Sequence, residues 1–558
     1  MAKYIKQLFL HKVTYLLLAV YIWFLTEVTK MCLVIKAENG YYTADFLYPI
    51  VNYSTFYFLI LLVTAVQYFG TFQKYSMQES LDALSYRKGE QKQVLCLLLI
   101  HVVLTVFLMG YCICLYAVSF HVSSDFLWHI LINIVVNVGM CGVLALVIGK
   151  CLSIPSSNLL RVLLLAAVIC ITSPIKNEIN FLLNLDASII EIFPENANFS
   201  VTGYLGYPVQ IQRIAMIVFW IMSHLAVLAF YFHKSMKKIV YPPLCILMAI
   251  VCFGIFMTPR TNLTGFGKEA SLVYSQLHYR GLQQSEKKEA GFSVEGYRMD
   301  LKASNQLKVK STLLVENTGA NDKPCAFTLY HVFQIKRIYN QWEDNLRYQR
   351  DGDYLYVYVP EGTKEITFEY EGNGCPFYGE YAGIYLPAGL PYYPIAGFHK
   401  VYDEENICFS QITLPKAVPF EVHVDYPGKV YSNLTKDEKF PIQERDRHST
   451  ENFSGTVKEV MFLSGFVNEI QYEGYRFLFP SSYNESRILD DIKETVDGFE
   501  AFEGELKESL SNKVFIWMPD INGADREAYF DDLVMCYMFK KEYLLNWYKE
   551  QYISKKEK

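Results

Sequence analysis

The sequence predicts a multi-pass α-helical membrane domain of about seven spans, followed by a mainly β (sandwich) extracellular domain with a small α/β C-terminal remnant. Two observations predict this division. Long apolar stretches end near residue 257, and an alternation of apolar and polar residues begins at Leu307. A membrane span needs roughly 20 mostly apolar residues, whereas a half-buried strand alternates with a period of two.

The two halves of the chain also differ in net charge. Residues 1–259 carry 16 Lys and Arg and 11 Asp and Glu, which leaves 35 of the 51 basic and 46 of the 57 acidic residues for 260–558. The net charge of −6 is therefore +5 on the apolar half and −11 on the polar half. An acidic domain offers no basic face to a phosphate backbone, so no nucleic acid partner is expected.

The loops between the apolar stretches predict the orientation. Basic residues such as Lys3, Arg87 and Lys237 gather on one set of loops, and acidic residues such as Asp45 and Glu191 on the other. By the positive-inside rule the N-terminus is expected in the cytoplasm and the C-terminal domain outside the plasma membrane. The weakest of the seven expected spans is the fifth, and they cover about 13–33, 51–70, 93–118, 127–149, 158–175, 211–232 and 239–257.

The predicted domains are a transmembrane domain at 1–257, a linker at 258–299, a β-sandwich at 300–482 and an α/β remnant at 483–558. About eight strands are expected in the sandwich, because short alternating runs are separated by turn residues. After Ser482 the period becomes helical, with one more strand at 513–519 and a last helix whose apolar face is expected to hold Tyr529, Leu533, Tyr537, Leu544 and Tyr548. The alternating runs are 307–315, 354–359, 365–370, 420–426, 460–466 and 475–480.

Several polar residues fall inside the predicted spans. Glu27 and Lys30, three residues apart, either line a substrate path or pair with each other near the interface. Gly139 and Gly142 are expected to permit close helix packing. The candidates for hydrogen bonds between helices are His101, Asn133, Asn137 and His224.

The cytoplasmic loop at 78–95, QESLDALSYRKGEQKQVL, resembles the loop after the second span in ABC-2 type exporter permeases. The resemblance implies that a short interfacial helix docks on an ATPase subunit, with Glu79, Leu81, Leu84, Ser85 and Arg87 at the coupling positions. Leu84 departs from the family pattern, which has a proline there. The alternative is an ordinary basic cytoplasmic loop.

This resemblance also implies partners. The chain has no GxxxxGK[ST] motif, so ATP is expected on a separate cytoplasmic ABC ATPase subunit and no cofactor in this chain. A second permease chain, identical or different, would complete the path through the lipid bilayer. The alternative function is a membrane-anchored receptor or scaffold whose spans transport nothing.

Residues 300–435 resemble the N-terminal β domain of M1 family aminopeptidases, most closely where a strand runs into Tyr431-Ser432-Asn433. Residues 485–519 resemble the start of the catalytic domain that follows in that family. The zinc-binding H-E-x-x-H motif is absent, so the sequence predicts no metal ligands, no catalytic residues and no enzyme activity. An active peptidase would need a partner to supply the ligands.

Other features of the extracellular domain leave alternatives open. Cys325, Cys375, Cys408 and Cys536 lack CxxC spacing, and they form up to two disulfides or remain free thiols. The segment 376–398, rich in Tyr, Gly and Pro, is either a ligand-binding surface or a loop that covers the sandwich. The histidines are far apart in sequence, which favours separate structural or surface roles for each; they are His278, His331, His399, His423 and His448.

Overall fold

The computed structural model of the chain divides into two units, Met1–Ala197 with Gly206–Arg260, and Asn198–Leu205 with Thr261–Lys558. Each unit is described by itself. The residues that the structure describes are 2–37, 47–74, 89–119, 124–155, 157–172, 192–193, 204, 209, 211–231, 241–258, 278–279, 289–316, 324–374, 377–380, 383–405, 408–437, 449–481, 485–500, 502, 510, 513–517, 528–530, 532–536, 539 and 541–557.

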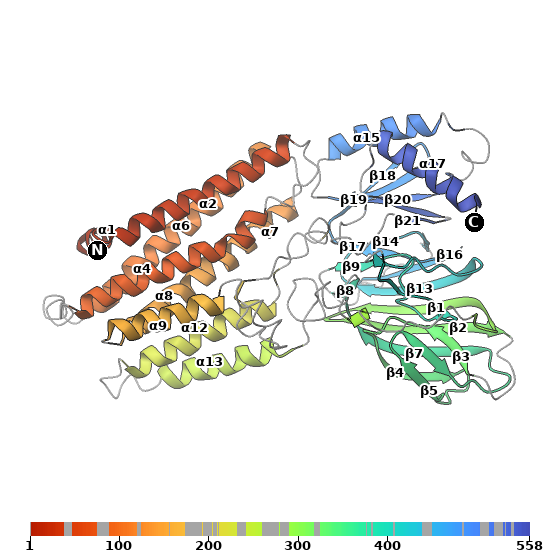
Figure 1. The fold of residues 1–558 in the computed structure, drawn as a ribbon, viewed down its shortest axis with the longest axis horizontal. Helices are drawn as coiled ribbons and strands as arrows, with labels where there is room; N and C mark the ends of the chain where they lie inside the picture. The colour runs from red at the N-terminus through yellow and green to blue at the C-terminus, as the bar shows by residue number, and fades with distance from the viewer. Residues whose placement is uncertain are drawn as a thin grey trace. The chain divides into compact units, whose positions relative to one another are not determined.

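The first unit is built of helices (Figure 1). Most are apolar over their whole length, which is typical of helices that face lipid as well as each other. α12 packs along α13, and α4 along α8. The helices are α1 (Ala2–Phe9), α2 (Lys12–Ala37), α3 (Tyr48–Asn52), α4 (Ser54–Lys74), α6 (Gly89–Ser119), α7 (Ser124–Ile134), η2 (Val135–Met140), α8 (Cys141–Ser153), α9 (Asn158–Thr172), α12 (Ile211–Tyr231) and α13 (Tyr241–Phe256).

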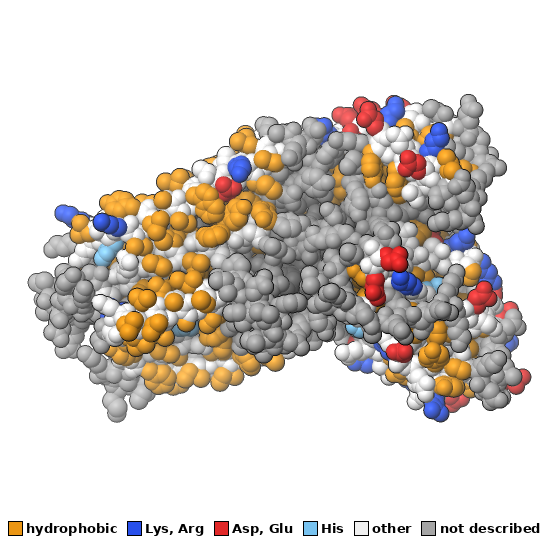
Figure 2. All heavy atoms as spheres, in the orientation of Figure 1, with side chains coloured by type: hydrophobic (Ala, Val, Ile, Leu, Met, Phe, Trp, Pro, Cys, Tyr) orange, Lys and Arg blue, Asp and Glu red, His pale blue; other side chains and the backbone are white. Residues whose placement is uncertain are grey.

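Within the described residues, five stretches of helix are long and apolar enough to cross a membrane. Five is fewer than the predicted seven, because the described parts of α9 and α13 have 15 and 16 residues. At about 1.5 Å per residue they fall short of the roughly 30 Å of hydrocarbon. Hydrophobic side chains cover the visible face of these helices (Figure 2). The five stretches are Lys12–Val34, Tyr48–Gly70, Gln91–Val118, Leu127–Ser153 and Ile211–Tyr231.

The second unit is mainly β, as the alternating runs predict. Its largest sheet has seven strands in the order β15-β16-β13-β1-β2-β7-β4. All neighbours pair antiparallel except β1 and β13, which are parallel and more than 100 residues apart in sequence. The strands are β1 (Ser293–Ala303), β2 (Leu307–Glu316), β4 (Gln334–Asn340), β7 (Glu365–Gly372), β13 (Val418–Tyr426), β15 (Thr435–Lys436) and β16 (Ser449–Val457).

Smaller sheets complete the β region. One has the order β10-β3-β6-β5, another β14-β17-β9-β8, and β11 pairs with β12. Aromatic side chains fill the core between these strands. The strands are β3 (Cys325–Thr328), β5 (Tyr348–Asp351), β6 (Tyr354–Val357), β8 (Tyr378–Glu380), β9 (Gly383–Leu386), β10 (Ile395–Ala396), β11 (Tyr402–Asp403), β12 (Cys408–Phe409), β14 (Val430–Ser432) and β17 (Phe462–Ser464).

The C-terminal part has α/β character, with a five-stranded sheet in the order β18-β19-β20-β22-β21. The predicted last helix is wrong for its first half, because Leu533–Cys536 is a buried strand parallel to β20. A buried strand is apolar on both faces, so its sequence does not alternate. The elements are β18 (Val467–Tyr472), β19 (Tyr475–Pro480), α15 (Glu485–Phe499), β20 (Val514–Trp517), β21 (Ala528–Tyr529), β22 (Leu533–Cys536) and α17 (Lys541–Glu557).

The Tyr-rich segment joins the core of the β region. Tyr392 and Tyr393 are 0% and 2% exposed, and the Tyr392 hydroxyl donates to the carbonyl oxygen of Val460 at 2.9 Å. The segment is therefore buried rather than a binding surface. Cys325, Cys408 and Cys536 are buried, and Cys375 lies outside the described residues.

One residue from between the predicted fifth and sixth spans also belongs to this core. Tyr204 is fully buried in the second unit. Its hydroxyl donates to the carbonyl oxygen of Trp517 at 2.5 Å, and its own carbonyl accepts from the amide of Phe466 at 2.7 Å. The second unit is therefore assembled from two separate parts of the chain.

Candidate functional site

The helical unit contains an irregular turn at its centre. The π-helix η2 lies between α7 and α8 and holds Asn137 and Gly139. Turns of π-helix are rare and are frequent at functional sites, because the extra residue shifts carbonyl groups and side chains out of the α-helical register. Asn137 is 1% exposed, so its amide lies inside the apolar bundle.

His101 of α6 connects this turn to another helix. Its Nε2 lies 2.9 Å from the carbonyl oxygen of Gly139, and its Nδ1 lies 2.9 Å from the hydroxyl of Tyr57 on α4. Because a carbonyl only accepts, Nε2 carries the hydrogen and Nδ1 accepts from Tyr57. A Cβ on Gly142 would lie 2.1 Å from the imidazole Cε1. The imidazole therefore fits only because residue 142 is a glycine.

Arg213 of α12 is one of three buried cations in the described part of the helical unit, with Lys150 and Arg161. It is 6% exposed and donates through Nη2 to the Asn137 side-chain oxygen at 2.5 Å and to the carbonyl oxygen of Ile192 at 3.1 Å. Both of these partners are neutral groups, and each stabilises the guanidinium charge through its dipole. A buried cation is costly unless polar groups surround it, which makes this arrangement a candidate functional site. We call Tyr57, His101, Asn137, Gly139, Gly142 and Arg213 the polar core.

The sequence identified only part of the polar core. His101 and Asn137 form the expected bonds between helices, but the His224 ring bonds the carbonyl oxygen of Trp220 in its own helix. The Asn133 amide likewise donates to His129, one turn earlier. Arg213 was missed, although it is the one charged residue within the predicted sixth span.

The charged pair in α2 has a simpler arrangement. The Lys30 ammonium lies 3.9 Å from the Glu27 carboxylate, and the Lys30 side chain is 72% exposed. Thr26, Thr29, Lys30, Leu33 and Val34 line an open groove of about 480 Å³. The two side chains therefore pair with each other on the exposed surface of α2.

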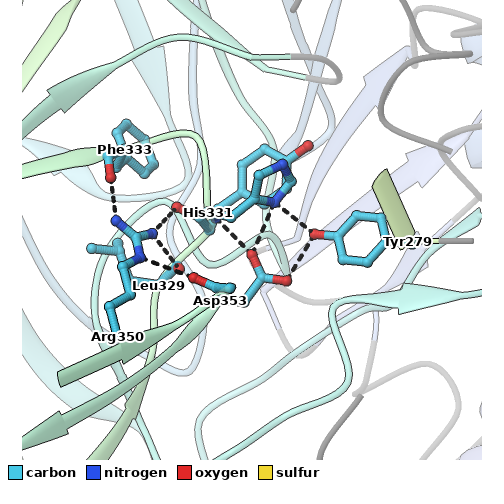
Figure 3. Close-up of polar contacts among 8 residues, drawn as sticks. Tyr279, Leu329, His331, Phe333, Arg350 and Asp353 are labelled. Carbon is cyan, nitrogen blue, oxygen red and sulfur yellow. Dashed lines mark hydrogen bonds and ion pairs between the residues drawn. The ribbon is translucent and has the colours of Figure 1, made fainter. Parts of the chain in front are cut away.

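The second unit has a polar cluster of its own around Asp353 (Figure 3). This carboxylate is 6% exposed. Its Oδ1 accepts from the His331 amide at 2.6 Å and lies 3.1 Å from His331 Nδ1, while Oδ2 accepts from the Tyr279 hydroxyl at 2.8 Å. Arg350 donates to the carbonyl oxygens of Leu329, Tyr330 and Phe333, which fixes the turn that carries His331.

The cluster brings together two histidines that the sequence treated separately. The rings of His278 and His331 stack with centroids 3.6 Å apart and an interplanar angle of 9°. Burial lowers the pKa of His278, and the neighbouring His331 lowers it further, against the opposing effect of the Asp353 carboxylate. The His278 imidazole is therefore favoured in its neutral form. Burial also raises the pKa of Tyr279 well above its usual value, and the Asp353 charge adds to this.

These contacts hold residues 278–279 against the β region. We call His278, Tyr279, His331 and Asp353 the clamp. Tyr279 is 1% exposed and stacks on Tyr402 with centroids 4.9 Å apart. Residues 278–279 belong to the predicted linker, so the clamp fixes that part of the linker to the β region. No group of three or more His, Cys, Asp or Glu side chains in the described residues has the geometry to hold a metal ion.

The predicted ATPase-coupling residues cannot be placed. Glu79, Leu81, Leu84, Ser85 and Arg87 lie outside the described residues. Their roles therefore stay predictions.

Comparisons with known proteins concern about half of the chain. The sequence matches no protein-family model and no curated protein. Among solved structures it resembles the native leukotriene A4 (LTA4) hydrolase of yeast, with 8% identity, a TM-score of 0.31, and coverage of 47% of this chain and 44% of that one. It also resembles an M1 zinc metallopeptidase from Deinococcus radiodurans, with 12% identity, a TM-score of 0.31, and coverage of 47% and 64%. The chain thus spans less than half of the length of the yeast enzyme.

The predicted absence of enzyme activity is contradicted by these comparisons, because the similar structures are a hydrolase and a metallopeptidase. The prediction is therefore withdrawn. The described residues hold five apolar helices compatible with a membrane and a mainly β region.

Proposed function

We propose that the chain is a permease subunit of an ABC-2 type exporter, with its mainly β region outside the cell. The polar core carries this proposal. A bundle that only anchors a domain needs no buried cation, yet Arg213 connects α12 to the π-helix at Asn137 and to Ile192. Buried polar contacts of this kind hold helices in one arrangement and can exchange partners in another.

The partners follow from the resemblance in the loop at 78–95. A cytoplasmic ABC ATPase subunit binds and hydrolyses ATP, and it docks on the loop through Glu79, Leu81, Leu84, Ser85 and Arg87. A second permease chain, identical or different, completes the path through the lipid bilayer.

Tyr204 constrains the number of membrane crossings. Its burial in the second unit requires Asn198–Leu205 and Thr261–Lys558 to be on the same side of the membrane. The number of crossings between them is then even, so if α12 crosses, α13 crosses too. With the N-terminus in the cytoplasm and the second unit outside, α9 must also cross. Short helices of this kind are accommodated by local thinning of the bilayer.

The orientation is tested by reporters fused after Lys558. Alkaline phosphatase, which is active only outside the cytoplasm, is expected to be active in this fusion. Green fluorescent protein, which is fluorescent only in the cytoplasm, is expected to be dark. The reverse result would place the second unit in the cytoplasm and would exclude the proposed exporter arrangement.

The ATPase partnership is tested by purification of the full chain from its native membrane. An ATPase subunit is expected to co-purify, and Glu79→Ala with Arg87→Ala is expected to weaken that association and the stimulation of ATP hydrolysis. Lys92→Ala is the matched control, since Lys92 is an exposed cation in the next helix and is not one of the proposed coupling positions. If no ATPase binds the wild-type chain, the receptor or scaffold function replaces the permease.

A further inference from the structure

The turn at residues 341–345 presents an exposed tryptophan. Trp342 is 57% exposed, which is the largest value for a large hydrophobic side chain in the described part of the second unit; Ile553 and Tyr348 follow at 46% and 38%. Exposed tryptophan is unfavourable in water, and tryptophan is enriched among the residues that contribute most to protein interfaces. A single exposed hydrophobic side chain is common and needs no explanation. Trp342 differs because the turn holds it in a fixed position.

The Asn340 side chain binds the backbone of this turn at two points. The Asn340 side-chain oxygen accepts from the amides of Trp342 and Asp344, both at 3.0 Å. Glu343 between them has a φ of 63°, in the left-handed region that a residue with a side chain rarely adopts. The hydrogen bonds to Asn340 therefore stabilise a backbone conformation at Glu343 that is unfavourable by itself.

Arg337 fixes the turn from the strand before it. Its guanidinium donates to the Glu343 carbonyl oxygen at 2.7 Å and to the Asn345 side-chain oxygen at 2.6 Å, and it stacks over the Tyr339 ring at 4.4 Å. Gln341 also joins the turn to its neighbour, since its amide donates to the Gly362 carbonyl oxygen at 3.2 Å. Trp342 is thus presented in advance by a rigid turn, which lowers the entropic cost of binding a partner.

Charge and strand order indicate the kind of partner. Glu343 and Asp344 are exposed next to Trp342, and neither carboxylate forms an ion pair within the described residues. The turn connects β4 and β5, each the last strand of its sheet. Edge strands can pair with an added extended segment, and an aromatic ring beside two carboxylates favours a cation.

We propose that the Trp342 turn binds an extended peptide segment that carries Lys or Arg beside an apolar side chain. The carboxylates of Glu343 and Asp344 attract the cation, and the indole ring of Trp342 covers both the cation and the apolar side chain. A bilayer surface is the less favourable occupant, because these two carboxylates would repel anionic lipid. The proposal does not depend on the exporter function.

The test uses the full chain in nanodiscs of phosphatidylcholine and a fluorescein-labelled peptide of repeated Arg-Leu-Gly. Fluorescence anisotropy is expected to show binding, and Trp342→Ala is expected to raise the Kd by roughly tenfold or more. Glu343→Gln with Asp344→Asn is expected to raise the Kd less and to reduce its dependence on salt. Ile553→Ala, which removes another exposed hydrophobic side chain, is the matched control and leaves the Kd unchanged.

Several outcomes would overturn the proposal. They are no binding of the arginine peptide, equal binding of a Glu-Leu-Gly peptide, or an unchanged Kd in Trp342→Ala. Stronger quenching by brominated lipid in the wild type than in Trp342→Phe would instead assign the turn to the bilayer. Because Trp342 is largely exposed, all these variants are expected to melt at the temperature of the wild type.

Discussion

Arg213 donates a hydrogen bond of 2.5 Å to the side-chain oxygen of Asn137, and both residues are buried in the helical unit. Two elements far apart in sequence are therefore joined by one polar contact in an apolar environment. Removal of Asn137 would leave the buried Arg213 guanidinium with one hydrogen bond fewer. A buried cation that loses a partner is costly in free energy of folding.

Asn137→Ala is expected to destabilise the helical unit by about 1.5–3 kcal/mol, the usual value for a hydrogen bond to a charged group. Thermal unfolding of the detergent-solubilised chain measures this change. His224→Phe is the matched control, because the hydrogen bond of the His224 ring among the described residues is to Trp220 in its own helix. Equal destabilisation by both variants would show that the Arg213 contact has no special role.

Gly142→Ala is expected to destabilise the same unit by about 1–3 kcal/mol, since the added methyl group would overlap the His101 imidazole. His101→Ala in the same chain makes room for that methyl group, so the double variant should lose less stability than the sum of the two single variants. Gly110→Ala is the control, because a Cβ there meets nothing within 4 Å. Strict additivity would contradict the proposed overlap.

Tyr279→Phe removes the donor to Asp353 Oδ2 and leaves that buried oxygen with one hydrogen bond fewer. A loss of about 1–3 kcal/mol from the clamp is expected, seen as faster hydrogen exchange in residues 278–279. Tyr348→Phe, on an exposed strand position, should leave this exchange unchanged. Unchanged exchange in Tyr279→Phe as well would mean that Tyr402 stacking alone holds the clamp.

Acidification is expected to loosen the clamp through His278. Burial lowers its folded-state pKa below the ordinary value of 6.5, so the unfolded state binds a proton first and stability falls as pH falls below about 6.5. His331 adds to this effect and Asp353 opposes it. His278→Phe keeps a stacked ring without a charge. Its second unit should lose less stability than the wild type between pH 7.5 and 5.5, as measured by the fluorescence of buried Trp517.

Asp532 is expected to act in the opposite direction. Burial raises its folded-state pKa above the ordinary value of 3.8, against hydrogen bonds from Asn433 and Glu459. The stabilisation is therefore present at low pH and is lost as pH rises through the raised pKa. Asp532→Asn should become more stable relative to the wild type as pH rises from about 4 to 7. A constant difference across that range would contradict the raised pKa.

The sequence predicted best where one local pattern decides the structure. The strands β2 and β13 lie where alternation placed them, and β13 buries every second residue from Val418 to Val424. The pattern failed for β22, because a strand that is buried on both faces does not alternate.

The candidate sites were harder to predict, because they depend on contacts between distant parts of the chain. Asn137 and His101 stood out as polar residues in apolar spans, but their partners Arg213 and Tyr57 come from other helices. His278 and His331 lie 53 positions apart, and nothing local indicates that their rings stack. The conformation of Glu343 likewise depends on Asn340 and Arg337 together.

The burial of Tyr204 sets an order for biosynthesis and a limit on truncation. The ribosome makes this residue two helices before the rest of the domain, so its pocket beside Trp517 can close only after the C-terminal strands have been synthesised. A recombinant fragment that starts at Thr261 would expose this pocket to solvent. Supplying the peptide 198–205 in trans is the direct way to restore it.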